Sequence, residues 1–171
     1  MIAARCFILD ANAFIEAKRR YYAFDICPGY WDALLHFHGA GRLLSIDRVQ
    51  VELLRGNDEL KAWAKSAPAT MFAPSDTEAV VGHYAQMQAW AAGKPQFTDE
   101  AKADFAAKAD AWLIAYAKAH RIVLVTHEEY AADARRKVPM PNVCRDFGVE
   151  YADVFTMLRE LTAKFVREKS T

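Results

Sequence analysis

Four acidic residues occupy positions from which a carboxylate could do chemistry: Asp10, Glu52, Asp110 and Glu128. Asp10 directly follows the apolar run Cys6–Leu9, and Glu128 follows the run Ile122–Val125 after two further residues. Short apolar runs of this kind, the second rich in β-branched residues, are typical of buried strands. Parallel strands deliver the residues behind them to one edge of a sheet, so we expect Asp10 and Glu128 in the same cleft.

Asp110 lies within a long helical pattern that we predict to run from Ala101 to Lys118. In one continuous helix, Ala106, Leu113, Ile114 and Ala117 would all lie within about 60° of it around the helix axis. An ionised carboxylate on such an apolar stripe is costly unless it is paired or binds a metal ion. A buried salt bridge, or a hydrogen bond to a neighbouring turn, is the alternative explanation.

Each of the other three acids also has an ordinary structural explanation. Asp10 would serve equally well as the N-cap of a helix that starts near Ala13. Glu128 would favour the positive end of a helix that follows it. Glu52 lies at the border of the apolar side of a predicted helix, Arg48–Leu54, where a surface glutamate is common.

The four acids together indicate a metal site more strongly than any one of them does. Carboxylates that converge at one edge repel one another when ionised, and a hard divalent cation with oxygen ligands removes that repulsion. Mg²⁺ or Mn²⁺ fits such a site. With the ion bound, the chemistry indicated is phosphodiester hydrolysis, and we expect Asn12 and Thr126 to orient the ligands.

Strands and helices alternate along the chain, which predicts an α/β fold with a central, mostly parallel sheet flanked by helices. We treat residues 1–171 as a single domain, since the chain is too short for two domains of typical size. The predicted strands are Cys6–Leu9, Leu43–Ile46, Thr70–Phe72 and Ile122–Val125. The predicted helices are Ala13–Tyr21, Trp31–Phe37, Arg48–Leu54, Asp58–Lys65, Thr77–Trp90, Ala101–Lys118 and Asp153–Arg167, with 138–142 expected to be a loop.

The composition excludes several classes of protein. Lys plus Arg and Asp plus Glu number 22 each, so no net field draws the whole molecule to nucleic acid or to an anionic membrane. The N-terminal apolar run is too short for a signal peptide or a membrane span, which predicts a cytoplasmic protein with no membrane partner. The three cysteines are far apart and indicate neither a disulfide framework nor a zinc site.

Taken in order, the segments 8–12, 52–53, 110–115 and 125–128 resemble the pattern of the PIN-domain family. In 15–22, 52–57 and 141–144 the chain further resembles a PIN-like subgroup of the DUF4411 type. The resemblance implies a PIN-like three-layer sandwich and a magnesium-dependent endoribonuclease, with Asp10, Glu52, Asp110 and Glu128 as catalytic residues and metal ligands. Glu128, preceded by His127, stands where the family commonly has Asp after Asn.

The resemblance also implies partners. Such proteins are often the toxin of a toxin–antitoxin pair and usually dimeric, so we expect an RNA substrate, a cognate antitoxin protein and a second copy of the chain. Basic residues near the acids in sequence would contact RNA phosphates, although solvated helix ends explain them equally well. These residues are Lys18, Arg19, Arg20, Arg48 and Arg55.

Three other functions fit parts of this pattern. The first is a catalytically inactive PIN-like binding module that acts through protein or RNA contacts. The second is a phosphatase with an aspartyl nucleophile, which needs a second Asp where this chain has Asn12. The third is a nucleotide-binding switch, which needs a glycine-rich loop that does not follow the first predicted strand.

Overall fold

Five short strands form the centre of the computed structural model, which describes residues 4–168. The strands lie in the order β3-β2-β1-β4-β5, and every neighbouring pair is parallel. The predicted α/β fold is therefore confirmed, with a sheet that is parallel throughout these residues. The strands are β1 (Phe7–Leu9), β2 (Leu43–Ile46), β3 (Phe72–Ala73), β4 (Val123–Val125) and β5 (Tyr151–Ala152).

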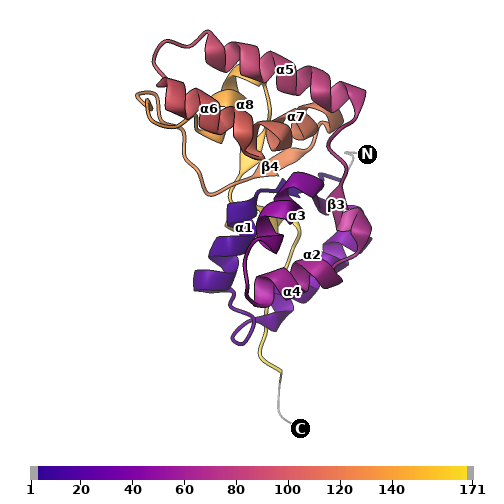
Figure 1. Ribbon diagram of the computed structural model, residues 1–171. Helices are drawn as coiled ribbons and strands as arrows, with labels where there is room; N and C mark the ends of the chain where they lie inside the picture. The colour runs from indigo at the N-terminus through magenta and orange to yellow at the C-terminus, as the bar shows by residue number, and fades with distance from the viewer. Residues whose placement is uncertain (1–3, 169–171) are drawn as a thin grey trace.

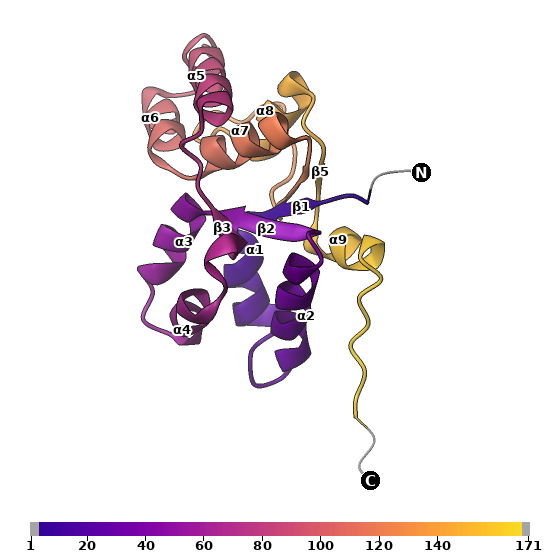
Figure 2. The same cartoon turned by 90° about the vertical axis from the view of Figure 1, so that its right-hand side faces the viewer.

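Helices cover both faces of this sheet and make a three-layer sandwich (Figures 1 and 2). One outer layer contains α5 (Glu78–Ala92), α6 (Asp99–Ala107), α7 (Asp110–His120) and α8 (Met140–Phe147). The other contains α1 (Ala11–Glu16), α2 (Pro28–Gly39), α3 (Asp47–Leu54), α4 (Glu59–Ser66) and α9 (Val154–Glu160). Two shorter helical segments are η1 (Ala17–Tyr21), which continues α1 as a π-helix, and η2 (Ala69–Met71).

The core lies on both faces of the central strands. Every residue of β1 is fully buried, and β4 is almost as well covered. Strands of a parallel sheet are apolar on both sides because helices pack on both, which explains the unbroken apolar runs in the sequence. Phe14 of α1 packs against Trp63 of α4 and Phe72 of β3, so the sheet and one helical layer share this aromatic contact.

The structure differs from the sequence-based prediction in several elements. The predicted helix Asp153–Arg167 is too long, because α9 ends at Glu160 and Thr162 has a positive φ. The predicted strand Thr70–Phe72 is misplaced, because 69–71 is the 3-10 segment η2 and the strand is Phe72–Ala73.

β5 was not predicted, because two residues are too few to show a period. The expected loop at 138–142 is wrong in its second half, because α8 begins at Met140 with Pro141 in its first turn. Proline is tolerated there because the first N–H groups of a helix have no intrahelical partner.

Candidate functional site

The carboxyl ends of β1 and β4 lie side by side and bring two polar residues together. Leu9 pairs with Val125 in the sheet, and the Asp10 N–H donates to the Val125 carbonyl at 3.1 Å. Asp10 and Thr126 are the next residues on the two strands. The Thr126 hydroxyl donates to Asp10 Oδ2 at 2.8 Å, the contact that an orienting role for Thr126 requires.

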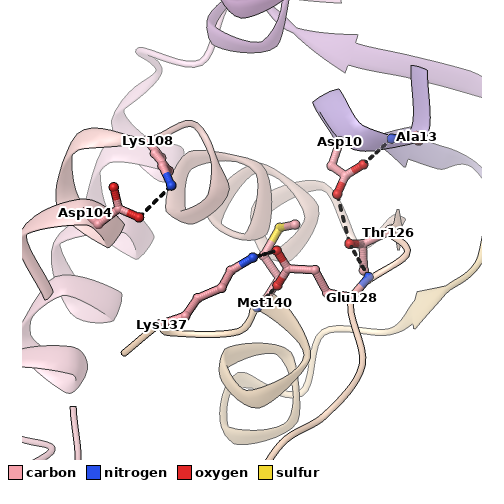
Figure 3. Close-up of polar contacts among 8 residues, drawn as sticks. All are labelled: Asp10, Ala13, Asp104, Lys108, Thr126, Glu128, Lys137 and Met140. Atoms are coloured by element: carbon pink, nitrogen blue, oxygen red, sulfur yellow. Dashed lines mark hydrogen bonds and ion pairs between the residues drawn. The ribbon is translucent and has the colours of Figure 1, made fainter. Parts of the chain in front are cut away.

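Asp10 is almost completely buried, with 2% of its surface exposed. It also caps α1, since Oδ1 accepts from the Ala13 N–H at 2.7 Å (Figure 3). The pKa of Asp10 is raised to about 7, chiefly by burial and to a smaller extent by the charges of Asp110 and Glu128, against the lowering effect of these two hydrogen bonds. The capping explanation therefore holds for Asp10, and it leaves a buried carboxyl beside two other acids.

Asp110 is the first residue of α7, and the predicted continuous helix 101–118 is wrong. The helix is interrupted at Lys108, which has an extended backbone, and Ala109 caps the next helix. Ala106 therefore belongs to α6 and is exposed, whereas Leu113 and Ile114 are buried in α7. The break turns a residue predicted in mid-helix into one at a helix N-terminus, where a carboxylate is favoured.

The environment of Asp110 nevertheless disfavours its charged form. Burial raises the pKa of Asp110 to about 6, and the charges of Glu128 and Glu52 add to the rise. Lys137 and Lys108 act in the opposite direction. Asp110 is thus affected by the charges of Glu128 and Glu52, and Asp10 by those of Asp110 and Glu128, although the four acids come from separate stretches of the chain.

The Glu128 carboxylate is bound by two groups from the segment that follows it in the chain. One carboxylate oxygen accepts from the Lys137 ammonium and the other from the Met140 N–H at 2.9 Å (Figure 3). The Glu128 N–H donates to the Thr126 hydroxyl oxygen at 3.1 Å, which links it to Asp10. No helix begins directly at Glu128, but its carboxylate lies at the N-terminus of α8, the next helix along the chain, so the helix-dipole explanation holds for this residue as well. The contact with Lys137 was not predicted, and its only sequence signal is the basic run 135–137.

Glu52 lies at the edge of the group. It is exposed on α3, and it lines a hollow of about 260 Å³ together with Arg48, Arg55 and Lys108, which we call the α3 hollow. Arg48 is fixed in place, because its guanidinium lies 3.8 Å from the centre of the Trp112 ring and donates to Ser75 at 3.0 Å. Two of the predicted substrate contacts, Arg48 and Arg55, thus lie beside a predicted acid.

The remaining predicted residues lie apart from the acids. Lys18 pairs with Asp58 at 2.8 Å and Arg20 with Glu16 at 3.0 Å, while Arg19 is exposed. They belong to η1, and a helix that rises about 1.5 Å per residue carries them roughly 12 Å beyond Asp10. Asn12 is exposed on α1, and no hydrogen bond joins it to Asp10 in the part of the chain described.

The donor set matches a hard divalent cation in chemistry, since it consists of carboxylates that raise one another's pKa. The set does not form a closed cage: within residues 4–168 no three His, Cys, Asp or Glu side chains are grouped so as to hold a metal ion. The arrangement of Glu128 supplies one reason, because its carboxylate is turned to Lys137 and to the N-terminus of α8.

The fold and site define a parallel α/β sandwich with an acid-lined carboxyl edge. The chain belongs to the family described as Domain of unknown function (DUF4411), whose model matches residues 7–165. This confirms the predicted resemblance to the DUF4411 type, whereas membership of the PIN-domain family stays a prediction. No curated protein matches the sequence. Between residues 4 and 168, no helix combines the length and apolar character needed to cross a membrane.

Proposed function

We propose that this protein is a metal-dependent endoribonuclease of the PIN type, which hydrolyses phosphodiester bonds of RNA. The observation that carries the proposal is the buried Asp10 carboxyl, whose pKa is raised to about 7 beside the charges of Asp110 and Glu128. Clustered acids with perturbed pKa values at the carboxyl edge of a parallel sheet are typical of a functional site. A purely structural role for Asp10 would require only its N-cap bond to α1 and not two further acids beside it.

The proposed roles follow from the surroundings of each residue. Asp10 and Asp110 would hold Mg²⁺ or Mn²⁺ as the central ligands, and Thr126 fixes the orientation of the Asp10 carboxylate. Glu128 would join them after it leaves Lys137, and Glu52 would act through water from its exposed position on α3. When bound, the cation polarises the phosphoryl oxygen and lowers the pKa of a coordinated water. Arg48, Arg55 and Lys108 are placed to neutralise RNA phosphates.

The inactive binding module is kept as a second candidate because of one observation. Glu128 already has a cationic partner in Lys137, so the acids of the site are partly neutralised without a metal ion. In that case the edge of the sheet would bind RNA or a protein partner without cleaving it. The roles of toxin and of antitoxin partner, and the homodimer, stay predictions under either candidate.

Cleavage of labelled single-stranded RNA tests the proposal. We expect cleavage in the presence of Mg²⁺ or Mn²⁺ and none in EDTA. The Asp10→Asn protein should be inactive, because the neutral amide lacks the negative charge with which a carboxylate holds a divalent cation, while its oxygen still accepts the Ala13 N–H.

The exposed Asp76→Asn variant, purified in the same way, should cleave like the unsubstituted protein. Equal cleavage by the Asp10→Asn protein would reveal a contaminating nuclease. Absence of cleavage across varied RNAs and both metals would favour the binding module.

A further inference from the structure

A second hollow adjoins the acids on the side away from α3. It has a volume of about 370 Å³, lies beyond the carboxyl ends of β4 and β5, and is lined by residues that include Thr126, His127, Glu128, Tyr130, Arg145 and Phe155. We call it the β4–β5 hollow. It adjoins the proposed site, because Thr126, which donates to Asp10, and Glu128 belong to its lining.

Flat side chains line this hollow. The Arg145 guanidinium lies 3.7 Å from the centre of the Tyr130 ring, and both residues are exposed, Tyr130 to 43%. The centres of the His127 and Phe155 rings lie 6.3 Å apart. Outside the lining of the hollow, the Tyr21 ring packs nearly perpendicular to the Phe155 ring with the ring centres 5.4 Å apart. An exposed tyrosine beside an arginine offers a planar surface on which another flat group can stack.

We propose that the β4–β5 hollow receives one unpaired base of a single-stranded RNA, next to the phosphate that lies at the acids. The proposal rests on the proposed function and specifies its substrate as an unpaired strand. Bases stack on aromatic and guanidinium planes without regard to sequence, because every base has a π-face. The volume is within the range of small-ligand sites. A base inside a duplex is already stacked and paired, so it does not reach the hollow.

In this proposal the two hollows bind different parts of the RNA strand. The α3 hollow contributes three cations, Arg48, Arg55 and Lys108, and is suited to the sugar–phosphate backbone. Lys108 is paired with Asp104 at 2.6 Å on exposed surface, a contact that a phosphate would have to replace (Figure 3).

The β4–β5 hollow contributes rings, the Arg145 guanidinium and the carboxylates of Glu128, Glu129 and Asp153. The rings and the guanidinium suit an uncharged base, whereas the carboxylates disfavour a phosphate there. Asp110 follows Ala109 of the first hollow and is influenced by Glu128 of the second, so a strand that occupies both passes the acids.

The test measures binding of a short fluorescent RNA to the Asp10→Asn protein, which is not expected to cut it. A series of oligonucleotides each carries one abasic nucleotide, so that a base is removed without loss of its phosphate. We expect one abasic position to weaken binding by about five- to 150-fold, the range of a single base–aromatic stacking contact. Duplex RNA of the same sequence should bind more weakly than the single strand.

Variants of the hollow connect this effect to its residues. In the Tyr130→Ala protein the sensitive abasic position should have no further effect, because the stacking partner is already absent, and Tyr130→Phe should restore the sensitivity. Arg145→Lys keeps the charge and loses the plane, so it should weaken binding. Its matched control is Arg121→Lys, an exposed position next to a different hollow at the C-terminal ends of α7 and α8. The Arg121→Lys protein should bind the RNA normally.

The possible results separate this inference from the proposed function. Cleavage by the unsubstituted protein, combined with equal binding of every abasic oligonucleotide, would overturn the base site and leave the nuclease standing. A position-dependent abasic effect that disappears in Tyr130→Ala, without cleavage in any metal, would support the base site and overturn catalysis. Failure of the single-stranded RNA to bind would overturn the base site.

Discussion

Asp10 determines how the metal-free protein should respond to pH. Its pKa is raised to about 7, mainly by burial, whereas an aspartate in an unfolded chain titrates near pH 3.9. Between these two values the folded state binds a proton that the unfolded state does not. The contribution of Asp10 to the free energy of unfolding therefore falls as the pH rises from about 4 to about 7.

The Asp10→Asn protein should be the more stable of the two at about pH 8 in EDTA, because it has no buried charge. The gain should disappear towards about pH 4, where Asp10 of the unsubstituted protein is protonated in both states. Its upper limit is about 4 kcal/mol, since each pH unit between the two pKa values contributes about 1.4 kcal/mol. Urea unfolding across this range measures the difference, with Asp76→Asn as the control.

A lower stability of Asp10→Asn at every pH would mean that the hydrogen bonds to Ala13 and Thr126 outweigh the cost of the charge. Asp10 would then have a structural role. That result would remove the argument that Asp10 is a metal ligand, because the N-cap of α1 would then be sufficient to explain the carboxylate.

At the scale of elements, the segment between β4 and α8 carries Glu128 and much of the β4–β5 hollow. It contains no helix or strand, so its position depends on contacts with its neighbours. Asn142 of α8 provides two of them, since Oδ1 accepts from the Ala131 N–H at 3.0 Å and Nδ2 donates to the Ala131 carbonyl at 2.8 Å. The Asn142 side chain is buried, whereas Ala131 lies on exposed surface, so water would replace only part of these bonds.

Asn142→Ala should therefore release this segment. We expect a loss of about 1–3 kcal/mol in the free energy of unfolding, because two partly buried backbone groups lose their partners. Trypsin should cut faster after Arg135, Arg136 and Lys137, which are all exposed on the segment. Asn57→Ala, at an exposed position, is the matched control and should change neither measurement. Unchanged proteolysis would mean that other contacts position Glu128.

At the scale of the whole molecule, the equal numbers of acidic and basic residues leave RNA binding to local groups. With no net charge there is no long-range attraction for a polyanion, and the α3 hollow offers three cations. Each phosphate contact to a single strand contributes about −0.7 to the slope of log K against log salt concentration. Three contacts predict a slope of roughly −2.

Binding of single-stranded RNA to the Asp10→Asn protein at a series of salt concentrations measures this slope. Arg55→Gln should make it shallower by about 0.7, whereas Lys65→Gln, on exposed surface of α4, should leave it unchanged. A slope steeper than about −5 would indicate a phosphate-binding surface much wider than the α3 hollow.

Several features of the fold and site follow from the sequence by itself. The apolar runs that became β1, β2 and β4 predicted a parallel sheet, because strands buried on both faces show no polar alternation. The positions of Asp10 and Glu128 behind two of these runs predicted that they share an edge. Local pattern suffices here because burial of both faces of a strand is visible in consecutive residues, and the helices between the strands imply parallel connections.

Other features were decided by the tertiary structure. Residues 101–118 contain enough alanine to form one helix, and nothing local marks the break at Lys108 that places Asp110 at the start of α7. β5 is too short to recognise in sequence and exists because it pairs with β4. The partner of Glu128 comes from a lysine nine residues away across an irregular segment. Burial, and the mutual influence of charges brought together from distant segments, arise only when the chain packs, so the pKa values of Asp10 and Asp110 belong to the fold.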